Sequence, residues 1–400
     1  VIPNFIEGIA QKQPVYKNLL ARFPNNPDSI EYYLNRPHKV KLFDYEHGTI
    51  EKEMSTMDSI RYMVHFMHCA FVAMEPKTGD VKAWVGDIDF KSWKYDKVTA
   101  MRQPGSTFKL FVYTEAMNQG LTPCDKRRDE YISMQVYDKK AGTEVTWTPT
   151  NANGSFSGDS VPLKGAFARS INSIAVRLGQ EMGVSRIAET AHKMGIESPL
   201  DETPSLTLGS SDVTLLELAN AYSTVANDGK YIKRRLVTRI LDRNGKEIYG
   251  PSVSEEQVIP YRSAYLMQQL LMSGLREPGG TSMSLNGYVG QYRDTDWGGK
   301  TGTSNNHSDA WFMGVSPNLV VGAWVGGEYR CIHFRTGALG QGSRTALPIC
   351  GYFLDAVLKD PAFSQYHAKF GKPKDESITS SMYNCNSYVP RAKADTSFKD

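Results

Sequence analysis

Arg102-Gln-Pro-Gly-Ser-Thr-Phe-Lys109 places a serine and a lysine where a helix is expected to begin. The Pro-Gly pair suits a helix start, and the residues after it predict a helix over 106–118. Side chains at i and i+3 lie on one helix face, so Ser106 and Lys109 are neighbours there. A serine becomes a nucleophile when a base removes its proton, and lysine can be that base when burial or a nearby cation lowers its pKa. The N-terminal end of a helix carries a positive partial charge, so it would also stabilise an oxyanion that forms at Ser106.

A surface serine followed by a solvated lysine would give the same S-x-x-K pattern, so one match alone is weak evidence. No other serine of the chain is followed by lysine at this spacing, and the match falls directly after the Pro-Gly pair. Both facts favour a functional interpretation of Ser106 and Lys109.

A second motif, Ser170-Ile171-Asn172, opens an amphipathic stretch that predicts a helix over 171–182. Residues at i and i+2 do not share a helix face, so Ser170 and Asn172 suit a loop that directs both side chains into a cleft. There Ser170 can pass a proton to a leaving amine, and Asn172 can hold a peptide backbone. Asn172 could equally be a helix cap. The S-x-N pattern is weak alone, since it also begins at Ser284, Ser304 and Ser316.

A third motif, Lys300-Thr-Gly-Thr303, lies on a predicted strand. Alternation places Lys300 and Gly302 on one face and Thr301 and Thr303 on the other. Two hydroxyls beside an ammonium suit a carboxylate, and Gly302 leaves room for a substrate backbone. The same letters at Lys77-Thr-Gly79 follow a proline and are interpreted as a four-residue turn.

Strands are expected near both ends of the chain, with helices between them, which predicts an α+β domain. The predicted strands are a hairpin at 69–74 and 81–85 and a meander at 298–303, 310–315 and 319–325. Further helices are predicted at 215–225 and 347–358. Residues 123–165 are rich in Pro, Gly, Asn and Asp and are expected to be mostly loop.

The composition indicates a globular chain. Of 400 residues, 40% are hydrophobic and 22% charged, which excludes a disordered or collagen-like protein. The net charge of +3 argues against a nucleic-acid partner, because such domains usually have a strongly basic face. No run of about 18 apolar residues appears, so no membrane span is predicted.

S-x-x-K, S-x-N and K-T-G in this order are the motif set of penicillin-binding proteins and class A β-lactamases. The segment around Ser106 resembles that of class A penicillin-binding proteins, whereas their class B relatives more often have a glutamate before the Pro-Gly pair. Further segments resemble the family in the family order: Ala73–Gly79 with Ala83–Gly86, Ala168–Leu178, Leu208–Ser210 with Leu218–Tyr222, and Gly299–Phe312. The resemblance covers about 66–358. It implies a β-lactamase/transpeptidase-like α+β fold, an antiparallel sheet flanked by helices plus a helical subdomain.

The resemblance also implies a role for each motif residue. Ser106 would be the acylated nucleophile, Lys109 its base and Ser170 the proton shuttle to the leaving D-alanine. Asn172 would be a substrate ligand, and Lys300 would lower the pKa of its neighbours.

The third motif, by the same resemblance, would bind substrate. Thr301 and Thr303 would clamp the terminal carboxylate, with Gly302 between them. The oxyanion hole would be the backbone N–H groups of Ser106 and Thr303.

The implied function is that of a D,D-transpeptidase that cross-links peptidoglycan stem peptides ending in D-Ala-D-Ala through a Ser106 acyl-enzyme, with β-lactams as inhibitors. A D,D-carboxypeptidase or a β-lactamase would differ only in the acceptor that deacylates the enzyme. A β-lactamase needs a group that activates water, and no motif here requires one. A non-catalytic β-lactam sensor or scaffold would be acylated without turning over any peptide, and three intact motifs argue against it.

Three segments are expected along the chain. Residues 1–65 are predicted to be an irregular N-terminal segment, the remnant of a linker, and 361–400 a loosely held C-terminal tail. Between them, 66–360 would form the penicillin-binding transpeptidase domain.

Class A members also have a membrane helix and a peptidoglycan glycosyltransferase domain, and neither lies in this sequence. The start at Val1 rather than Met suits an excised part of a longer protein. The resemblance implies an extracytoplasmic location on the periplasmic side of the bacterial inner membrane, with the anchor outside this chain. Other cell-wall synthesis proteins would be its protein partners, and cell shape its context.

No metal and no cofactor are predicted. His65 and His68 are three apart, but no acidic or cysteine partner accompanies them at ligand spacing. The cysteines form no C-x-x-C pair. In an oxidising periplasm Cys331 and Cys350 would be candidates for a disulfide; otherwise they would stay free thiols. Cys69, in an apolar strand, is expected to be a buried thiol.

Overall fold

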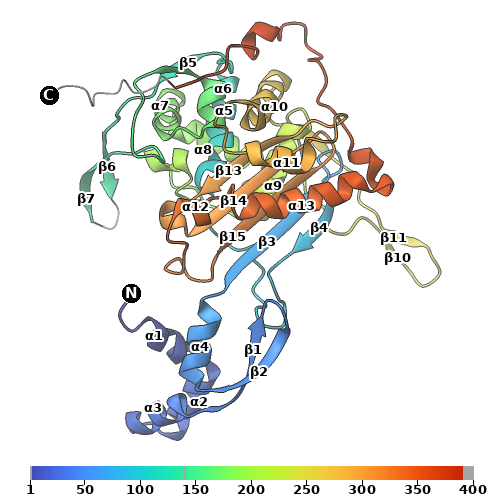
Figure 1. Cartoon of the computed structure of the whole chain (residues 1–400). Helices are drawn as coiled ribbons and strands as arrows, with labels where there is room; N and C mark the ends of the chain where they lie inside the picture. The colour runs from blue at the N-terminus through green and yellow to red at the C-terminus, as the bar shows by residue number, and fades with distance from the viewer. Residues whose placement is uncertain (1, 139–140, 391–400) are drawn as a thin grey trace, which may run out of the picture.

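The computed structural model describes residues 2–138 and 141–390. Its centre is a five-stranded antiparallel sheet with the order β13-β14-β15-β3-β4 (Figure 1). The strands are β3 (Met67–Met74), β4 (Val81–Val85), β13 (Gly298–Thr303), β14 (Asp309–Val315) and β15 (Val320–Gly327). Val72 of β3 pairs with Gly322 of β15, so the predicted hairpin and the predicted meander join in one sheet. The predicted α+β class is confirmed.

The sheet separates two hydrophobic clusters, as the alternation of side chains along β14 shows. Trp311 and Met313 face one cluster, whereas Phe312 between them faces the other. The cluster of Phe312 is covered by α13 (Ala346–Lys359), which crosses the sheet in Figure 1, and by α11 (Asn286–Val289). The larger cluster, which contains Trp311, is formed with the helices that pack on the opposite face of the sheet. The sheet therefore has helices on both faces.

These helices are α5 (Lys109–Asn118), α6 (Leu163–Ala168), α7 (Asn172–Met182), α8 (Val184–Lys193), α9 (Leu215–Ala226) and α10 (Tyr261–Arg276). The helices predicted near 106–118, 171–182, 215–225 and 347–358 are confirmed as α5, α7, α9 and α13. α10 was not predicted, because polar residues such as Gln268 interrupt its apolar pattern. Gln268 is nevertheless buried, and its amide donates a hydrogen bond to the carbonyl of Val225 (2.9 Å).

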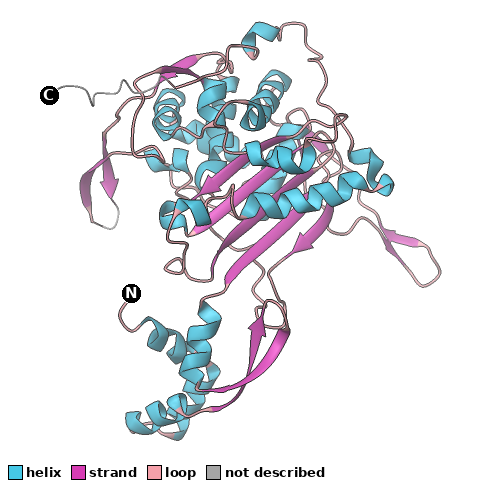
Figure 2. Cartoon of the chain, viewed as in Figure 1, coloured by secondary structure: helices cyan, strands magenta, loops and turns pink. Residues whose placement is uncertain are grey.

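The N-terminal segment is not irregular, and the prediction for it was wrong. It contains α1 (Phe5–Lys12), α2 (Pro14–Arg22), α3 (Pro27–Asn35), α4 (Thr56–Val64) and a hairpin of β1 (His38–Asp44) with β2 (Gly48–Met54). These helices bury a hydrophobic cluster of their own, which includes Ile30, Leu34 and Ile60. Figure 2 shows the helices and the hairpin as a unit below the sheet, joined to it where α4 runs into β3. Because each helix has only eight or nine residues, the apolar period was too short to be noticed.

The region 123–165 contains more strand than predicted. β5 (Lys126–Arg128) pairs with β8 (Ser160–Pro162), and β6 (Met134–Asp138) pairs with β7 (Thr143–Trp147). Residues 139–140, at the turn of the second pair, lie outside the described residues. Short strands also follow α9: β9 (Lys230–Ile232) pairs with β12 (Glu255–Gln257), and β10 (Ile240–Leu241) with β11 (Glu247–Tyr249). A short helix, α12 (Gly337–Gly340), precedes α13.

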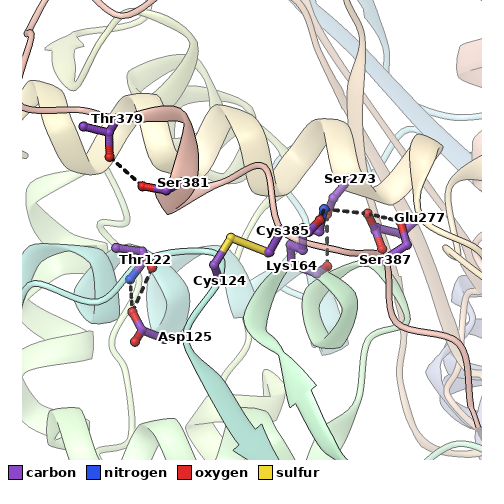
Figure 3. Close-up of a disulfide and its surroundings, with 10 residues drawn as sticks. All are labelled: Thr122, Cys124, Asp125, Lys164, Ser273, Glu277, Thr379, Ser381, Cys385 and Ser387. Carbon is purple, nitrogen blue, oxygen red and sulfur yellow. Dashed lines mark hydrogen bonds and ion pairs between the residues drawn. A yellow bond between two sulfur atoms is a disulfide. The ribbon is translucent and has the colours of Figure 1, made fainter.

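The C-terminal tail is held to the body through residue 390, which corrects the prediction of a loose tail. Cys385 forms a disulfide with Cys124 near the end of α5, with the two Cα atoms 5.6 Å apart (Figure 3). The proposed pair of Cys331 and Cys350 does not form, because Cys331 is exposed whereas Cys350 lies on the buried face of α13. Cys69 is half-buried rather than buried. Residues 391–400 lie outside the described part of the chain.

Within the described residues, no helix is long and apolar enough to cross a membrane.

Candidate active site

Ser106 lies on a tight turn, η1 (Gly105–Phe108), that leads into α5. Neighbouring elements fix this turn on several sides. The Tyr222 hydroxyl donates to the carbonyl of Thr107 (2.8 Å), and the Trp311 indole donates to the carbonyl of Gln103 (2.7 Å). Ser106 itself is half-buried, and its hydroxyl has no hydrogen bond to any described residue. A rigid turn therefore presents a free hydroxyl to the cleft.

Gly105 allows the Ser106 turn to approach β13. Its φ is +53°, and a Cβ at this position would lie 2.7 Å from the carbonyl oxygen of Thr303. No other residue type fits such backbone contact without strain. The backbones that were predicted to form the oxyanion hole, at Ser106 and Thr303, are thus adjacent.

Lys109 begins α5 and is completely buried. Its ammonium donates hydrogen bonds to the carbonyl of Ser170 (2.8 Å) and to Oδ1 of Asn172 (2.7 Å), and it lies 3.2 Å from the Ser170 hydroxyl. Among the described residues, no carboxylate forms an ion pair with it. Burial, and then the charge of Lys300, hold the pKa of Lys109 well below its ordinary value. This lysine therefore holds its proton weakly.

Ser170 lies in the turn between α6 and α7, and its φ of +59° is unusual for a residue other than glycine. This conformation turns its hydroxyl toward both lysines, since Lys300 also donates to it (2.9 Å). Strained backbone of this kind is retained where surrounding contacts impose it. The predicted loop geometry of the second motif is thus observed, with Asn172 as the first residue of α7.

The third motif lies on β13, an edge strand of the sheet. Lys300 points inward, where burial lowers its pKa to about 7 and its ammonium lies 5.7 Å from the ring centre of Phe167. Thr301 and Thr303 point the other way: the Thr301 hydroxyl donates to that of Thr281 (2.7 Å), and the Thr303 hydroxyl accepts from the backbone of Gly342 (3.2 Å). The predicted alternation along this strand is therefore observed.

Gly302 is explained differently from the expectation. A Cβ there would lie 2.5 Å from the carbonyl oxygen of Pro104, so the glycine makes room for the nucleophile turn of the same chain. That a substrate backbone also approaches Gly302 stays a prediction.

The three motifs meet at one cleft of about 340 Å³. Its lining includes Ser106, Ser170, Asn172, Thr301 and Thr303. A second hollow of about 310 Å³ continues from Ser106 toward the loop after β7. The two lysines lie buried beneath the cleft rather than in its surface.

Sequence reasoning missed the residues that hold Asn172 in place. The amide of Asn172 donates to the carbonyl of Thr150 (2.8 Å), and its backbone N–H donates to Oδ1 of Asn151 (3.0 Å). Asn151 is fixed in turn by Asp129, a buried carboxylate 2.7 Å away that also accepts from Ser173. Thr150, Asn151 and Asp129 belong to no recognisable motif, so no local sequence pattern would have predicted their role.

Such an arrangement suits acyl transfer. A free hydroxyl stands at a rigid turn, a buried lysine that holds its proton weakly begins the same helix, and a second lysine shares a serine with the first. Two threonines line the opposite wall, where a carboxylate can be bound.

Comparison with known proteins identifies the family of this fold and cleft. A family model described as the penicillin-binding protein transpeptidase domain matches residues 69–324, more than half of the chain. The chain belongs to the penicillin-binding protein transpeptidase family. A second model, the penicillin-binding protein middle domain, matches residues 1–67. The resemblance stated from the motifs is thereby confirmed.

Curated relatives of this penicillin-binding chain are named penicillin-binding protein 1A. That of Neisseria meningitidis is 34% identical over 297 residues, covering 72% of this chain and 36% of the relative. That of Rickettsia conorii is 31% identical over 381 residues, covering 89% of this chain and 45% of the relative. The chain thus spans less than half the length of these relatives. Their name agrees with the class A character of the Ser106 segment.

Solved penicillin-binding proteins share the fold. The crystal structure of penicillin-binding protein 1A from Haemophilus influenzae superposes with a TM-score of 0.69 at 25% identity, over 77% of this chain and 49% of that one. PonA1 of Mycobacterium tuberculosis, solved in complex with penicillin V, has a TM-score of 0.61 at 22% identity, over 92% of this chain and 96% of that one. At this identity, the second comparison supports the fold alone.

Proposed function

We propose that this penicillin-binding chain is a serine-type D,D-transpeptidase that cross-links peptidoglycan stem peptides ending in D-Ala-D-Ala. The observation that supports it best is the contact of Lys109 and Lys300 with one hydroxyl, that of Ser170. Two buried cations at one serine lower each other's proton affinity, which is what activation of Ser106 by a lysine requires.

In the acylation step, Oγ of Ser106 attacks the carbonyl carbon of the penultimate D-alanine while Lys109 takes the hydroxyl proton. The N–H groups of Ser106 and Thr303 bind the oxyanion of the tetrahedral intermediate. The C–N bond then breaks, and the leaving D-alanine receives a proton through Ser170. Asn172 binds the peptide backbone, and Thr301 and Thr303 bind the terminal carboxylate beside Gly302.

In the transfer step, the amine of a second stem peptide attacks the ester carbon. A C–N bond forms and the bond between that carbon and Oγ of Ser106 breaks. The amine proton returns to Ser106 through Ser170 and Lys109, so the enzyme is restored. β-Lactams, which resemble the D-Ala-D-Ala end, would acylate the same serine.

Hydrolytic alternatives share the acyl-enzyme but need a group that activates water. Among the described residues, no aspartate or glutamate lines the cleft around Ser106. This favours transfer to an amine over a β-lactamase or a carboxypeptidase. A sensor or scaffold would not need both buried lysines at one hydroxyl.

An extracytoplasmic location is part of the proposal. The disulfide between Cys124 and Cys385 supports it, because disulfides form and persist in oxidising compartments. In the full-length protein, a membrane anchor and a glycosyltransferase domain would occupy sequence outside this chain. Other cell-wall synthesis proteins would be partners on the periplasmic side of the inner membrane.

A labelling experiment tests the nucleophile. Labelled penicillin should attach covalently at Ser106, Ser106→Ala should abolish the label, and the exposed Ser254→Ala should keep it. Label that persists in Ser106→Ala would sink the assignment.

A product assay tests the reaction. Donor and acceptor stem peptides are incubated with the protein, and the products are separated by mass. Cross-linked product supports the transpeptidase, trimmed donor alone supports the carboxypeptidase, and acylation without peptide product supports the sensor.

A further inference from the structure

A second groove opens from the cleft on the side of Ser170. Its volume is about 760 Å³, and it shares Asn151, Ala152, Arg169 and Ser170 with the cleft. The remaining walls come from the loop at 153–159 and from Tyr388 and Pro390 near the end of the described chain. A ligand that lies in this groove can therefore also reach the turn that carries Ser170, where groove and cleft meet.

Arg169, at the junction of groove and cleft, has no anionic partner among residues 2–138 and 141–390. Its guanidinium makes no hydrogen bond or ion pair with any described residue, and its Nε is buried without a partner. Packing holds the group instead: it lies over the ring of Tyr388, 5.2 Å from the ring centre, and against Gly279, where a Cβ would be 2.8 Å from Cζ. A guanidinium that is partly removed from water and unpaired is unfavourable until an anion binds it, and its planar fork matches a carboxylate.

The nearby carboxylates are already engaged. Asp129 accepts hydrogen bonds from Ser173 (2.6 Å) and Asn151 (2.7 Å), and Asp159 accepts from the hydroxyl of Tyr388 (2.9 Å). The unpaired charge of the groove is thus positive, and it lies one residue from Ser170.

The strap, defined as residues 380–390, builds the wall on which Arg169 rests. The disulfide of Cys385 ties the strap to the body, and Lys164 of α6 donates to the Cys385 carbonyl (Figure 3). Ser387 donates to Glu277 (3.0 Å), which pairs with Lys164. Gly165 lets Tyr388 approach α6, since a Cβ there would lie 2.9 Å from that of Tyr388. The stacking partner of Arg169 is therefore fixed before any ligand arrives.

We propose that this groove is the acceptor arm of the active site, and that Arg169 binds a carboxylate of the amine-bearing peptide. The inference rests on the proposed transpeptidase function. Ser170 would give a proton to the leaving amine, so an incoming amine, which follows the reverse route, must reach Ser170 as well. When the amine of such a peptide lies at Ser170, a carboxylate near that amine can reach the neighbouring Arg169.

Paired acceptors that differ only in a carboxylate test this inference. The protein would be given a peptide donor ending in D-Ala-D-Ala, together with glycine or glycinamide, or with D-alanylglycine or its amide, so that every transfer product differs from the donor. The readout is the ratio of transfer product to hydrolysis product for each acceptor. In at least one pair the wild type should prefer the carboxylate by about tenfold, the worth of one charge-assisted ion pair.

Arg169→Gln should abolish that preference, Arg169→Lys should keep part of it, and Arg186→Gln, an exposed arginine on α8, should keep all of it. A purely structural loss would lower the use of both members of a pair alike, so the preference isolates the carboxylate contact. No preference in the wild type, or an unchanged preference in Arg169→Gln, would overturn the acceptor arm alone. Failure of penicillin to label Ser106 would overturn it together with the proposed function.

Discussion

Lys109 and Lys300 are buried cations that share one hydroxyl, and the free energy of their protonation links catalysis to stability. Neither is paired with a carboxylate in the described structure. Each is satisfied only by neutral oxygens, so the charged form of each is less favourable than in water. Weakly held protons on these lysines are what the proposed acyl transfer requires.

If Lys109 is the base, its neutral form is what matters, and arginine cannot replace it. Arginine keeps the positive charge at any attainable pH. We expect both Lys109→Arg and Lys109→Ala to lower the acylation rate by labelled penicillin at least about a hundredfold, the usual contribution of a general base. The measurement is the second-order rate of labelling, with circular dichroism to show that each variant is folded. Substantial acylation in Lys109→Arg would assign Lys109 an electrostatic role instead.

Lys300 makes the fold more stable as pH rises. Its pKa is about 7 in the folded state against an ordinary value of 10.5, so the unfolded chain binds more protons between these values. The free energy of unfolding should therefore increase with pH in this window, by at most about 1.4 kcal/mol per unit for this one group. Relative to Lys300→Met, the wild type should gain stability between about pH 7.5 and 9.5. The free energies of unfolding of both proteins would be measured by urea denaturation at several pH values. The same pH dependence in the wild type and in Lys300→Met would contradict this prediction.

The motif residues are the part of the site that could be predicted from sequence. Helical spacing links Ser106 and Lys109, and strand alternation links Thr301 and Thr303. The order of the three motifs, which resembles that of the family, then marked these residues as one site. Arg169, Asn151 and Thr281 could not be found in this way, because each acts through a contact with a residue distant in sequence.

Among the elements, β13 and the Ser106 turn are in close backbone contact at Gly302. Gly302→Ala would place a Cβ 2.5 Å from the carbonyl oxygen of Pro104, and a backbone atom cannot move aside cheaply. We expect a loss of about 1–3 kcal/mol in the free energy of unfolding, together with slower acylation. Gly8→Ala in α1 is the matched control, because nothing lies within 4 Å of the Cβ it adds. Equal effects of the two substitutions on thermal unfolding and acylation would refute this account.

Elements that contain apolar runs bounded by turn residues, or that adjoin a motif, were predicted correctly even where they are buried on nearly every face, as α5 and α9 are. α7 was recognised from its apolar stripe. α10 was not predicted although it is the longest helix of the described chain, because polar residues such as Gln268 interrupt its apolar run. The N-terminal helices are stable only through their shared cluster, since isolated helices of that length are marginal.

For the whole molecule, the disulfide should be a main source of stability for the tail. It joins residues 261 positions apart, and closing a long loop removes much conformational entropy from the unfolded chain. We expect Cys385→Ser to lower the free energy of unfolding by about 2–4 kcal/mol. Cys331→Ser, at an exposed free thiol, should change it little. Equal denaturation midpoints for the wild type and Cys385→Ser would rule out this role.

The pairing of Cys124 with Cys385 could not be predicted from the sequence alone. Both residues lie in loops without periodicity, and their proximity depends on how the tail returns over α6. Cys331 and Cys350 were candidates because they flank a loop after the last predicted strand, in a chain expected to lie in an oxidising periplasm.

The pairing of β3 with β15 also sets the moment during synthesis at which the cleft can form. During synthesis, the Ser106 turn emerges long before β13 delivers Lys300, and the central pair of the sheet closes only when β15 has been made. A nascent chain therefore exposes its serine without the second lysine or the threonine wall. Susceptibility to β-lactams would be acquired in one late event, so partly made chains would escape acylation and only completed domains would be consumed by the antibiotic.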